Sequence, residues 1–224
     1  FKEEIIEEKE SYNQQKYTFF DNEIENDNNK TRIPKMSYIG QLHGTYLLAQ
    51  AEGEFFIIDQ HAAAERVNYE KILEALKKDD KISYELLVPF KLDFTSAEAL
   101  LINEHITDIN NLGVQIEDFG GGTFMVRQVP LWFKKGYEKD YVEEVITHVI
   151  NNYKKEKHQF LSNMAKSIAC KKSIKGNEYH SKMEIEYLLE DLGKTNNPYT
   201  CPHGRPVIVK FSKYEIEKWF KRVV

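Results

Sequence analysis

Cys201 and His203 stand two residues apart near the end of the chain, with Pro202 between them, in the segment Cys201–Pro206. In an extended segment, residues two apart project from the same side, and the proline fixes one backbone angle. A thiolate beside an imidazole is a pairing typical of zinc. Because two ligands cannot close a tetrahedral site, a fold that uses this segment must bring other parts of the chain to it.

The segment from Asp59 to about Lys78 offers the missing partners. It mixes aliphatic and charged residues without Gly or Pro, a pattern typical of a helix. His61 and Glu65 are four residues apart, so they lie on one helical face and can point at one ion. Glu70 lies nearly opposite His61 around the helix, so we interpret it as structural or as supporting the ligands.

Asp59 comes directly before this helix, at the end of a strand-like stretch. A carboxylate at that position either caps backbone N–H groups or binds a hard divalent cation beside the softer site. The sequence leaves both roles open.

Cys170 lies near the end of another predicted helix, in a lysine-rich stretch that includes Lys171 and Lys175. A free cysteine is usually a small buried apolar residue. In a chain that already has Cys201 and His203 as possible zinc ligands, Cys170 is also a candidate ligand. The lysines either contact phosphate or complement the negative helix terminus. Arg205 either pairs with a nearby acid or holds a phosphate through two hydrogen bonds.

Strand pairs and helices alternate along the chain. The expected elements are a hairpin of 38–48 and 55–58, a helix at 59–78, a strand at 84–92, a helix at 95–112, a hairpin of 114–119 and 123–129, helices at 140–153 and 158–172, a helix capped by Ser181, a strand at 207–211 and a last helix capped by Ser212. We therefore predict a two-lobed α/β protein of the α+β kind.

The domain organisation follows from the same pattern. Residues 1–35 are acidic and polar and are expected to be a linker, which suggests the carboxy-terminal piece of a longer protein. Residues 36–80 and 156–224 are expected to form one lobe from both ends of the chain. Residues 81–155 are expected to form an external lobe.

Charge and composition narrow the function classes. Residues 1–30 hold nine acidic and four basic residues, and the remainder holds 27 of each, so the folded part is neutral. A neutral body argues against a domain that grips nucleic acid by charge alone. Two cysteines fit a reducing compartment, and no apolar run approaches the roughly 20 residues that span a bilayer. We expect a cytoplasmic protein without a membrane partner.

Four short elements, in order, resemble those of MutL-type DNA mismatch repair proteins. They are Asp59-Gln60-His61-Ala62 followed by Glu65 and Glu70, which has the spacing of that family's endonuclease motif; Ala169-Cys170-Lys171, with Lys for the family's Arg; Cys201 to Pro206; and Phe220-Lys221-Arg222. The resemblance covers about residues 36–224, which correspond to the family's carboxy-terminal dimerisation and nuclease region.

The resemblance implies a metal-dependent endonuclease that nicks duplex DNA in methyl-independent mismatch repair and forms a homodimer. It implies a regulatory or structural zinc ion (Zn2+) and catalytic manganese or magnesium (Mn2+ or Mg2+). The implied zinc ligands are His61, Glu65, Cys170, Cys201 and His203. Asp59 is the implied carboxylate for cleavage, acting as a metal ligand beside His61 and Glu65.

The resemblance also implies partners: the family's amino-terminal ATPase domain, MutS, and the replication sliding clamp, with association to the bacterial nucleoid when active. The stretch that matches the clamp-binding motif comprises Tyr84, Leu86, Leu87, Val88 and Pro89, and Tyr84 stands where the family has Gln.

Two alternatives belong to other classes. A zinc-stabilised dimerisation module without nuclease activity would keep all the ligands for folding alone. A zinc hydrolase of small substrates would have three ligands and an open position in a closed apolar pocket. The acid-rich start of the chain and the complete motif set argue against the hydrolase, whereas the dimerisation module remains open, to be separated by substitution of Asp59 and by removal of the metal.

Overall fold

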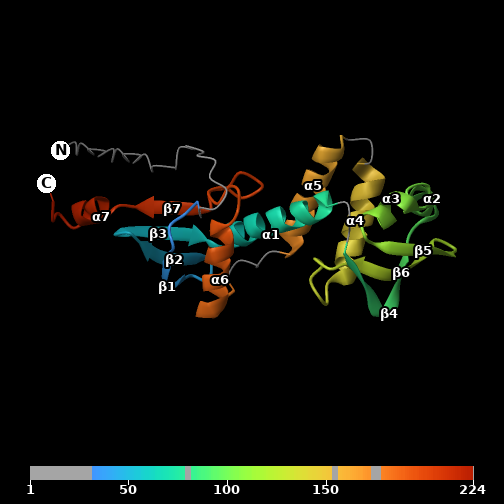
Figure 1. Ribbon diagram of the computed structural model, residues 1–224, viewed down its shortest axis with the longest axis horizontal. Coiled ribbons are helices and arrows are strands. Elements are labelled where there is room, and N and C mark those ends of the chain that lie inside the picture. The colour runs from blue at the N-terminus through green and yellow to red at the C-terminus, as the bar shows by residue number, and fades with distance from the viewer. Residues whose placement is uncertain (1–31, 79–81, 153–155, 173–177, 224) are drawn as a thin grey trace, which may run out of the picture.

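The computed structural model describes residues 32–78, 82–152, 156–172 and 178–223. Most of the expected linker, residues 1–31, lies outside this range. The described residues form two antiparallel sheets and the helices that pack on them, joined lengthwise by one long helix (Figure 1). This mixture of helices with antiparallel sheets confirms the predicted α+β class.

The first sheet has the strand order β1-β2-β3-β7. Its strands are β1 (Ser37–Leu42), β2 (Tyr46–Ala51), β3 (Glu54–Asp59) and β7 (Ile208–Phe211). β7 pairs with β3, so Ile58 lies opposite Ile208, about 150 residues later in the chain. The expected strand at 207–211 thus joins the amino-terminal hairpin, and this lobe contains both ends of the described chain.

The expected single strand at 38–48 is wrong, because the chain turns at His43 and Gly44. Both residues have positive φ, 53° and 60°, and the Thr45 N–H donates to the Leu42 carbonyl over 3.1 Å. Only Gly44 favours such a turn in the sequence, since positive φ is uncommon for a histidine. The result is two successive hairpins instead of one.

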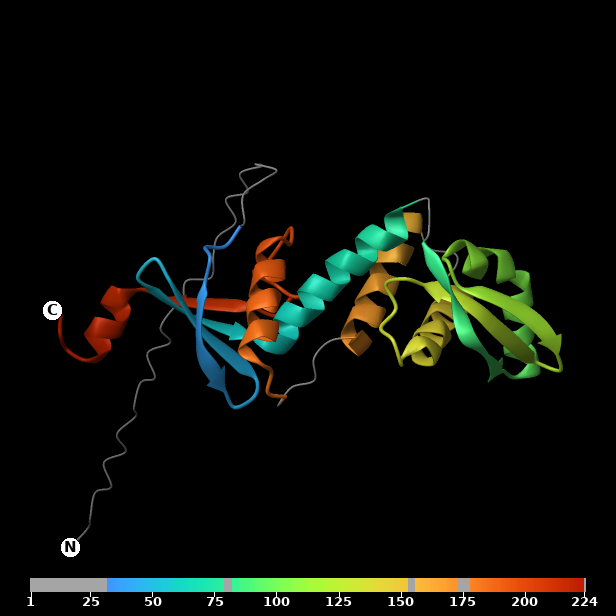
Figure 2. The same cartoon turned by 60° about the horizontal axis from the view of Figure 1, so that its bottom comes forward.

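Helix α1 (Gln60–Lys77) confirms the predicted helix and joins the two lobes, as Figure 2 shows. Ala63 and Val67 in its first half pack in the core of the first sheet, together with Leu189 of α6 (Lys182–Gly193). Ile72 and Leu76 in its second half pack in the core of the second lobe. One continuous helix therefore holds the lobes together through two separate cores.

The second sheet has the order β4-β6-β5, from β4 (Ser83–Asp93), β5 (Gln115–Gly120) and β6 (Thr123–Pro130). The predicted helix at 95–112 is two helices, α2 (Ser96–Glu104) and α3 (Ile106–Asn111). The break falls at His105, with φ −111° and ψ 15°, where the imidazole Nδ1 lies 3.3 Å from the Asp108 carboxylate. No Gly or Pro marks the position, so the sequence pattern runs through the break without a signal.

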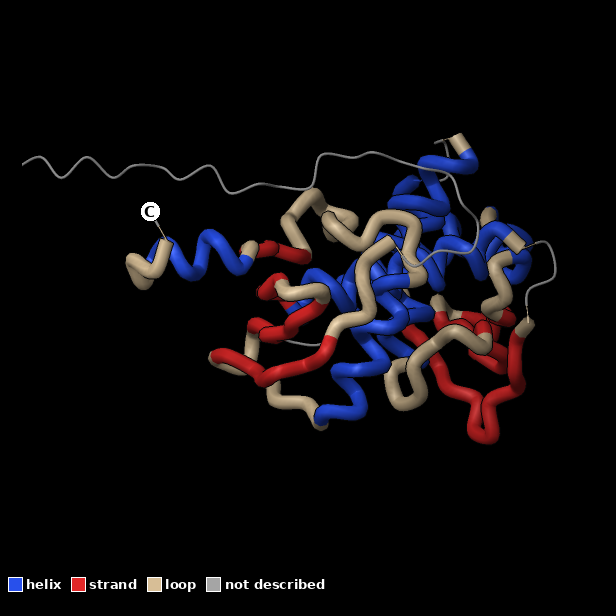
Figure 3. The backbone as a smooth tube through the Cα atoms, turned by 60° about the vertical axis from the view of Figure 1, so that its left-hand side comes forward, coloured by secondary structure: helices blue, strands red, loops and turns tan. Residues whose placement is uncertain are grey.

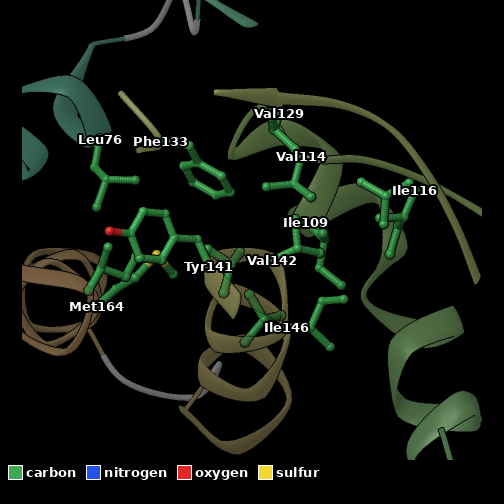
Figure 4. Close-up of a cluster of buried hydrophobic side chains, with 14 of the residues drawn as sticks. Leu76, Ile109, Val114, Ile116, Val129, Phe133, Tyr141, Val142, Ile146 and Met164 are labelled. Atoms are coloured by element: carbon green, nitrogen blue, oxygen red, sulfur yellow. The ribbon is translucent and has the colours of Figure 1, made fainter. Parts of the chain in front are cut away.

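Helices α4 (Glu138–Asn152) and α5 (Lys157–Lys172) complete the second core. Tyr141 lies there against Leu76 and Met164, which brings α4, α1 and α5 together (Figure 4). The last helix, α7 (Lys213–Trp219), projects from the end of β7 (Figures 1 and 3). Within the described parts of the chain, every helix is too short or too polar to cross a membrane.

Candidate metal centre

Helix α1 presents His61 and Glu65 one turn apart, as their spacing predicts. His61 Nε2 lies 3.3 Å from Glu65 Oε1. The Glu65 side chain is only 4% exposed, whereas that of His61 is 30% exposed. A carboxylate so deeply buried requires a cation or hydrogen-bond donors beside it.

Those donors come from the other end of the chain. His203 Nδ1 lies 3.3 Å from the second oxygen of Glu65, Oε2. One ligand atom from each of Glu65, Cys201 and His203 falls within 4.8 Å of the other two. The fold therefore brings the Cys-Pro-His segment to the face of α1 that carries His61 and Glu65, although more than 130 residues of chain separate them.

The segment is a tight turn, not the extended stretch that the sequence suggested. The Cys201 N–H donates to the Arg205 carbonyl over 2.8 Å, and the Gly204 N–H donates to the Cys201 carbonyl over 2.9 Å. Gly204 has a φ of +86°, a conformation that L side chains rarely adopt. The turn still brings the Cys201 thiol and a His203 ring nitrogen together beside Glu65. The His203 backbone N–H also donates to Cys201 Sγ over 3.4 Å.

Two further residues of α1 form hydrogen bonds with the backbone of the loop that leads into this turn. Glu70 accepts hydrogen bonds from the backbone N–H of Asn196 over 2.6 Å and of Asn197 over 3.2 Å. Arg66 donates from Nε to the Thr200 carbonyl over 2.6 Å. Arg66 was not identified from the sequence; its one available signal was the four-residue spacing from Glu70, with which it forms an ion pair.

Cys170 lies at the carboxy-terminal end of α5, which packs along α1. The Tyr69 hydroxyl of α1 and the Ser162 hydroxyl of α5 lie 3.0 Å apart. Burial raises the pKa of the Cys170 thiol, and so does its hydrogen bond to the Glu65 carboxylate. Cys170 therefore faces the same carboxylate as His61 and His203.

Asp59 is the residue immediately before α1 and caps it. Its Oδ1 accepts a hydrogen bond from the Ala62 N–H over 3.0 Å, and its own N–H donates over 2.9 Å to the carbonyl of Val207, the residue before β7. This bond uses one of roughly four acceptor positions of the carboxylate. The cap and a cation contact are thus compatible at Asp59.

The basic candidates fall in different places. Lys171 forms an ion pair with Glu144 of α4, so its ammonium group has a protein partner. Lys175 lies outside the described residues. Arg205 is exposed on the turn that carries the ligands, close enough to the Cys170 thiol to counteract the rise in its pKa.

The donor set fits zinc. Zinc bonds of about 2.0–2.3 Å put two tetrahedral ligand atoms roughly 3.3–3.8 Å apart. The 3.3 Å separations from Glu65 to His61 and His203 are of this size. Imidazole, thiolate and carboxylate are also the donor types that zinc takes in proteins.

The candidate clamp-binding stretch lies on β4, far along α1 from this cluster. The pairing of β4 with β6 is interrupted between Glu85 and Phe90. At this bulge Leu87 and Val88 project fully into solvent, with 102% and 80% exposure. Pro89 is also exposed, whereas Leu86 packs against the core of the lobe.

Tyr84, at the start of this stretch, is held by its own lobe. Its hydroxyl donates to the Glu138 carboxylate over 3.1 Å, and burial, followed by this bond, raises the pKa of Tyr84.

The fold and the cluster define an α+β protein with a candidate zinc-type centre between a long helix and a Cys-Pro-His turn. The sequence model of the MutL C-terminal dimerisation domain matches residues 39–180. The chain belongs to this family.

Relatives share sequence over most of the chain. The DNA mismatch repair protein MutL of a Geobacillus species is 48% identical over 193 residues, which is 86% of this chain and 31% of the relative. The MutL protein of Pediococcus pentosaceus is 44% identical over 192 residues, 86% of this chain and 30% of the relative. That of Bacillus cytotoxicus is 38% identical over 232 residues, 98% of this chain and 36% of the relative. The chain thus spans about a third of the length of these curated relatives.

Proposed function

We propose that this domain is a metal-dependent endonuclease that nicks duplex DNA during mismatch repair and that it pairs with a second copy of itself. One observation carries the proposal: donor atoms of Glu65, Cys201 and His203, from opposite ends of the chain, lie within 4.8 Å of one another. His61 and Cys170 face the same carboxylate. Asp59 stands at the start of the helix that carries this cluster.

The residues divide by donor chemistry. His61, Glu65, Cys170, Cys201 and His203 would hold zinc, since soft and borderline donors suit that ion. The hard oxygen of Asp59 suits manganese or magnesium. A divalent ion held there offsets the negative charge that develops on a phosphodiester under attack by water.

The chain's own groups orient the DNA. The exposed Arg205 guanidinium stands on the ligand-bearing turn, where it can hold a backbone phosphate through two hydrogen bonds. The neutral charge of residues 31–224 provides little long-range attraction for DNA. Delivery to DNA is therefore assigned to partners: the amino-terminal ATPase domain, MutS and the sliding clamp.

A clamp contact is supported by the exposed Leu87–Val88 tip on β4. Two adjacent apolar side chains that are fully exposed at a bulge suit insertion into an apolar groove of a partner. Tyr84, which stands in place of the family's Gln, bonds Glu138 and leaves this tip unobstructed.

The homodimer is assigned to the face of the first sheet opposite α1 and α6, at one end of which Trp219 of α7 packs on Phe211. Leu48, Ile57 and Val209 lie side by side across β2, β3 and β7, and all three are only half-buried. The core with α1 and α6 lies on the other face, where Leu47 and Ile58 are fully buried. A continuous apolar strip on a sheet face is typical of a surface that a second copy covers.

The proposal is tested by Asp59→Asn in the full-length protein. Nicking of supercoiled plasmid in the presence of manganese is expected to fall by at least about 100-fold, since a carboxylate that holds the ion is lost. Asparagine caps helices as well as aspartate does, so the fold and the dimer should persist. Asp93→Asn, an exposed acid of the other lobe, serves as the control. Undiminished nicking by the Asp59 variant would refute the nuclease assignment.

A zinc-stabilised dimerisation module is the second candidate, because a metal bound by the same cluster would link α1 to the turn after α6 and would stabilise the fold. Removal of metal by a chelator separates the two functions. A purely structural site predicts that chelation unfolds the domain, as a shifted thermal transition would show. The nuclease proposal predicts that nicking is lost under conditions in which the helical circular dichroism signal persists.

A further inference from the structure

Gln60 stands between the two motif residues Asp59 and His61, but neither metal binding nor capping uses its side chain. It is one of few polar residues buried in the described structure, at 1% exposure. Its Nε2 donates to the Gly44 carbonyl over 2.8 Å and to the Glu178 carbonyl over 2.9 Å. Its Oε1 accepts from Gln41 Nε2 over 2.6 Å. Both donors and one acceptor position of the amide are therefore satisfied by protein groups.

Gln41 extends this contact into a small network. Its Nε2 also donates to the Glu178 carbonyl over 2.8 Å, and its Oε1 accepts from the His180 N–H over 3.3 Å. The two side-chain amides thus bind both Glu178 and His180. That segment is the point at which the described chain resumes after α5, eight residues beyond Cys170.

The network joins three parts of the chain around the first turn of α1. They are the β1–β2 turn at Gly44, the end of β1 at Gln41 and the segment at Glu178. The backbone N–H of Gln60 adds a further bond to the Thr45 carbonyl over 3.1 Å. Successive helical residues point about 100° apart, so Gln60 can bind this network while His61 faces Glu65. A rotation of the first turn would move both side chains together.

We propose that Gln60 is a positioning residue for the metal centre: its buried amide fixes the first turn of α1, and with it Asp59 and His61, against the chain that returns from Cys170. Only an amide fits this place. A carboxylate of the same length would set negative charge against two carbonyl oxygens, and an apolar side chain would leave the Gly44 carbonyl without its donor and the Glu178 carbonyl with only its bond from Gln41. This inference rests on the proposed zinc site, whose ligands Gln60 would orient without touching the ion.

The test compares Gln60→Met with Gln115→Met, an exposed glutamine of the other lobe, in the 224-residue chain. The first readout needs no metal. Hydrogen exchange of the metal-free protein at His180 and at the β1–β2 turn is expected to quicken on the order of 10-fold in the Gln60 variant, the factor that about one lost hydrogen bond represents. The Gln115 variant is expected to match the unmodified chain. Unchanged exchange in the Gln60 variant would overturn the inference.

The second readout is zinc affinity, measured by competition with a chromogenic chelator. Gln60→Met is expected to weaken zinc binding at least about 10-fold, as losses of groups that orient metal ligands do. Faster exchange with unchanged affinity would limit Gln60 to a structural role and overturn positioning. If the unmodified chain bound no zinc, the proposed metal site itself would fail, while the exchange readout would still report on the network.

Gln41→Met is the second variant, for use if Gln60→Met fails to fold. It removes one partner and leaves both Gln60 donors bonded, and Gln41 is only half-buried. Exchange at His180 is expected to quicken at least as much, because this change removes the acceptor of the His180 N–H. Zinc affinity is expected to fall by a smaller factor than in the Gln60 variant. No shift in either readout would overturn the inference.

Discussion

At the scale of single residues, Glu70 shows how the motif separates binding from support. Its position on the helix relative to His61 argues against a shared ion, and its carboxylate bonds the loop at Asn196 and Asn197. That loop leads into the turn that carries Cys201. Glu70 therefore binds the backbone of a distant segment that leads to the candidate metal centre.

Glu70→Gln is expected to destabilise the domain by about 1.5–3 kcal/mol, because an amide NH2 would face N–H donors that now bond a charged oxygen. This loss corresponds to a fall in the melting temperature of roughly 3–12 °C for a protein of this size. Thermal unfolding followed by circular dichroism measures it. Glu74→Gln, an exposed acid one turn further along α1, is the control and should shift the transition little. Equal shifts in the two variants would contradict the assigned role.

At the scale of elements, α4 and α5 are joined by a polar contact beside the metal centre. Glu144 of α4 accepts a hydrogen bond from Ser167 and pairs with Lys171, both on α5. Burial by itself would raise the pKa of Glu144, but the bonds from Lys171 and Ser167 outweigh it and hold that pKa below its usual value. Lys171 follows Cys170 directly, so this contact fixes the end of α5 that carries the thiol.

The depressed pKa sets the pH dependence of this contact. A carboxyl whose pKa is lower in the folded chain stabilises the fold above its unfolded value, and that stability is lost as the pH falls through the folded pKa. Glu144→Gln is expected to cost about 1–3 kcal/mol at pH 7, with the difference shrinking as the pH falls below about 4. Urea unfolding at several pH values measures this, with Glu143→Gln as control. A difference that does not vary with pH would contradict the ion pair.

At the scale of the whole molecule, the surfaces proposed for dimerisation and metal binding lie on one lobe, and the surface proposed for clamp binding lies on the other. The first lobe holds the candidate metal centre and the sheet face opposite α1 and α6, which carries Ile57. The second lobe presents the exposed Leu87–Val88 tip. α1 runs between the lobes and packs in both cores (Figure 2). One helix thus links the surfaces assigned to the second copy, to the metals and to the clamp.

Ile57→Asp is expected to dissociate the homodimer, because it places a charge in the middle of the apolar strip formed by Leu48, Ile57 and Val209. Sedimentation velocity measures the change, with the apparent mass falling by about half. Leu100→Asp, at a side chain that is 73% exposed on α2, is the control and should stay dimeric. A dimer that survives the Ile57 substitution would place the interface elsewhere.

The sequence by itself determined the class of fold, most of the elements and the residue types of the metal centre. Helical spacing already placed His61 beside Glu65, and capping boxes marked Thr95, Ser181 and Ser212 as helix starts. These are local properties, set by backbone geometry within a few residues. The break at His105 escaped prediction because no Gly or Pro marks it, and the turn at His43 and Gly44 escaped because its single Gly stands beside a histidine, which rarely adopts positive φ.

Only the tertiary structure decided which groups meet. Lys171 forms an ion pair with Glu144, and the Cys-Pro-His segment forms a turn. Arg66 and Gln60 donate to backbone carbonyls of distant segments. No periodicity reports partners such as those of Arg66 and Gln60, because a contact between residues more than 100 positions apart depends on how complete helices and strands pack. The spacing in the sequence specified the candidate donors, and the packing of α1 against the two ends of the chain brought Glu65, Cys201 and His203 together.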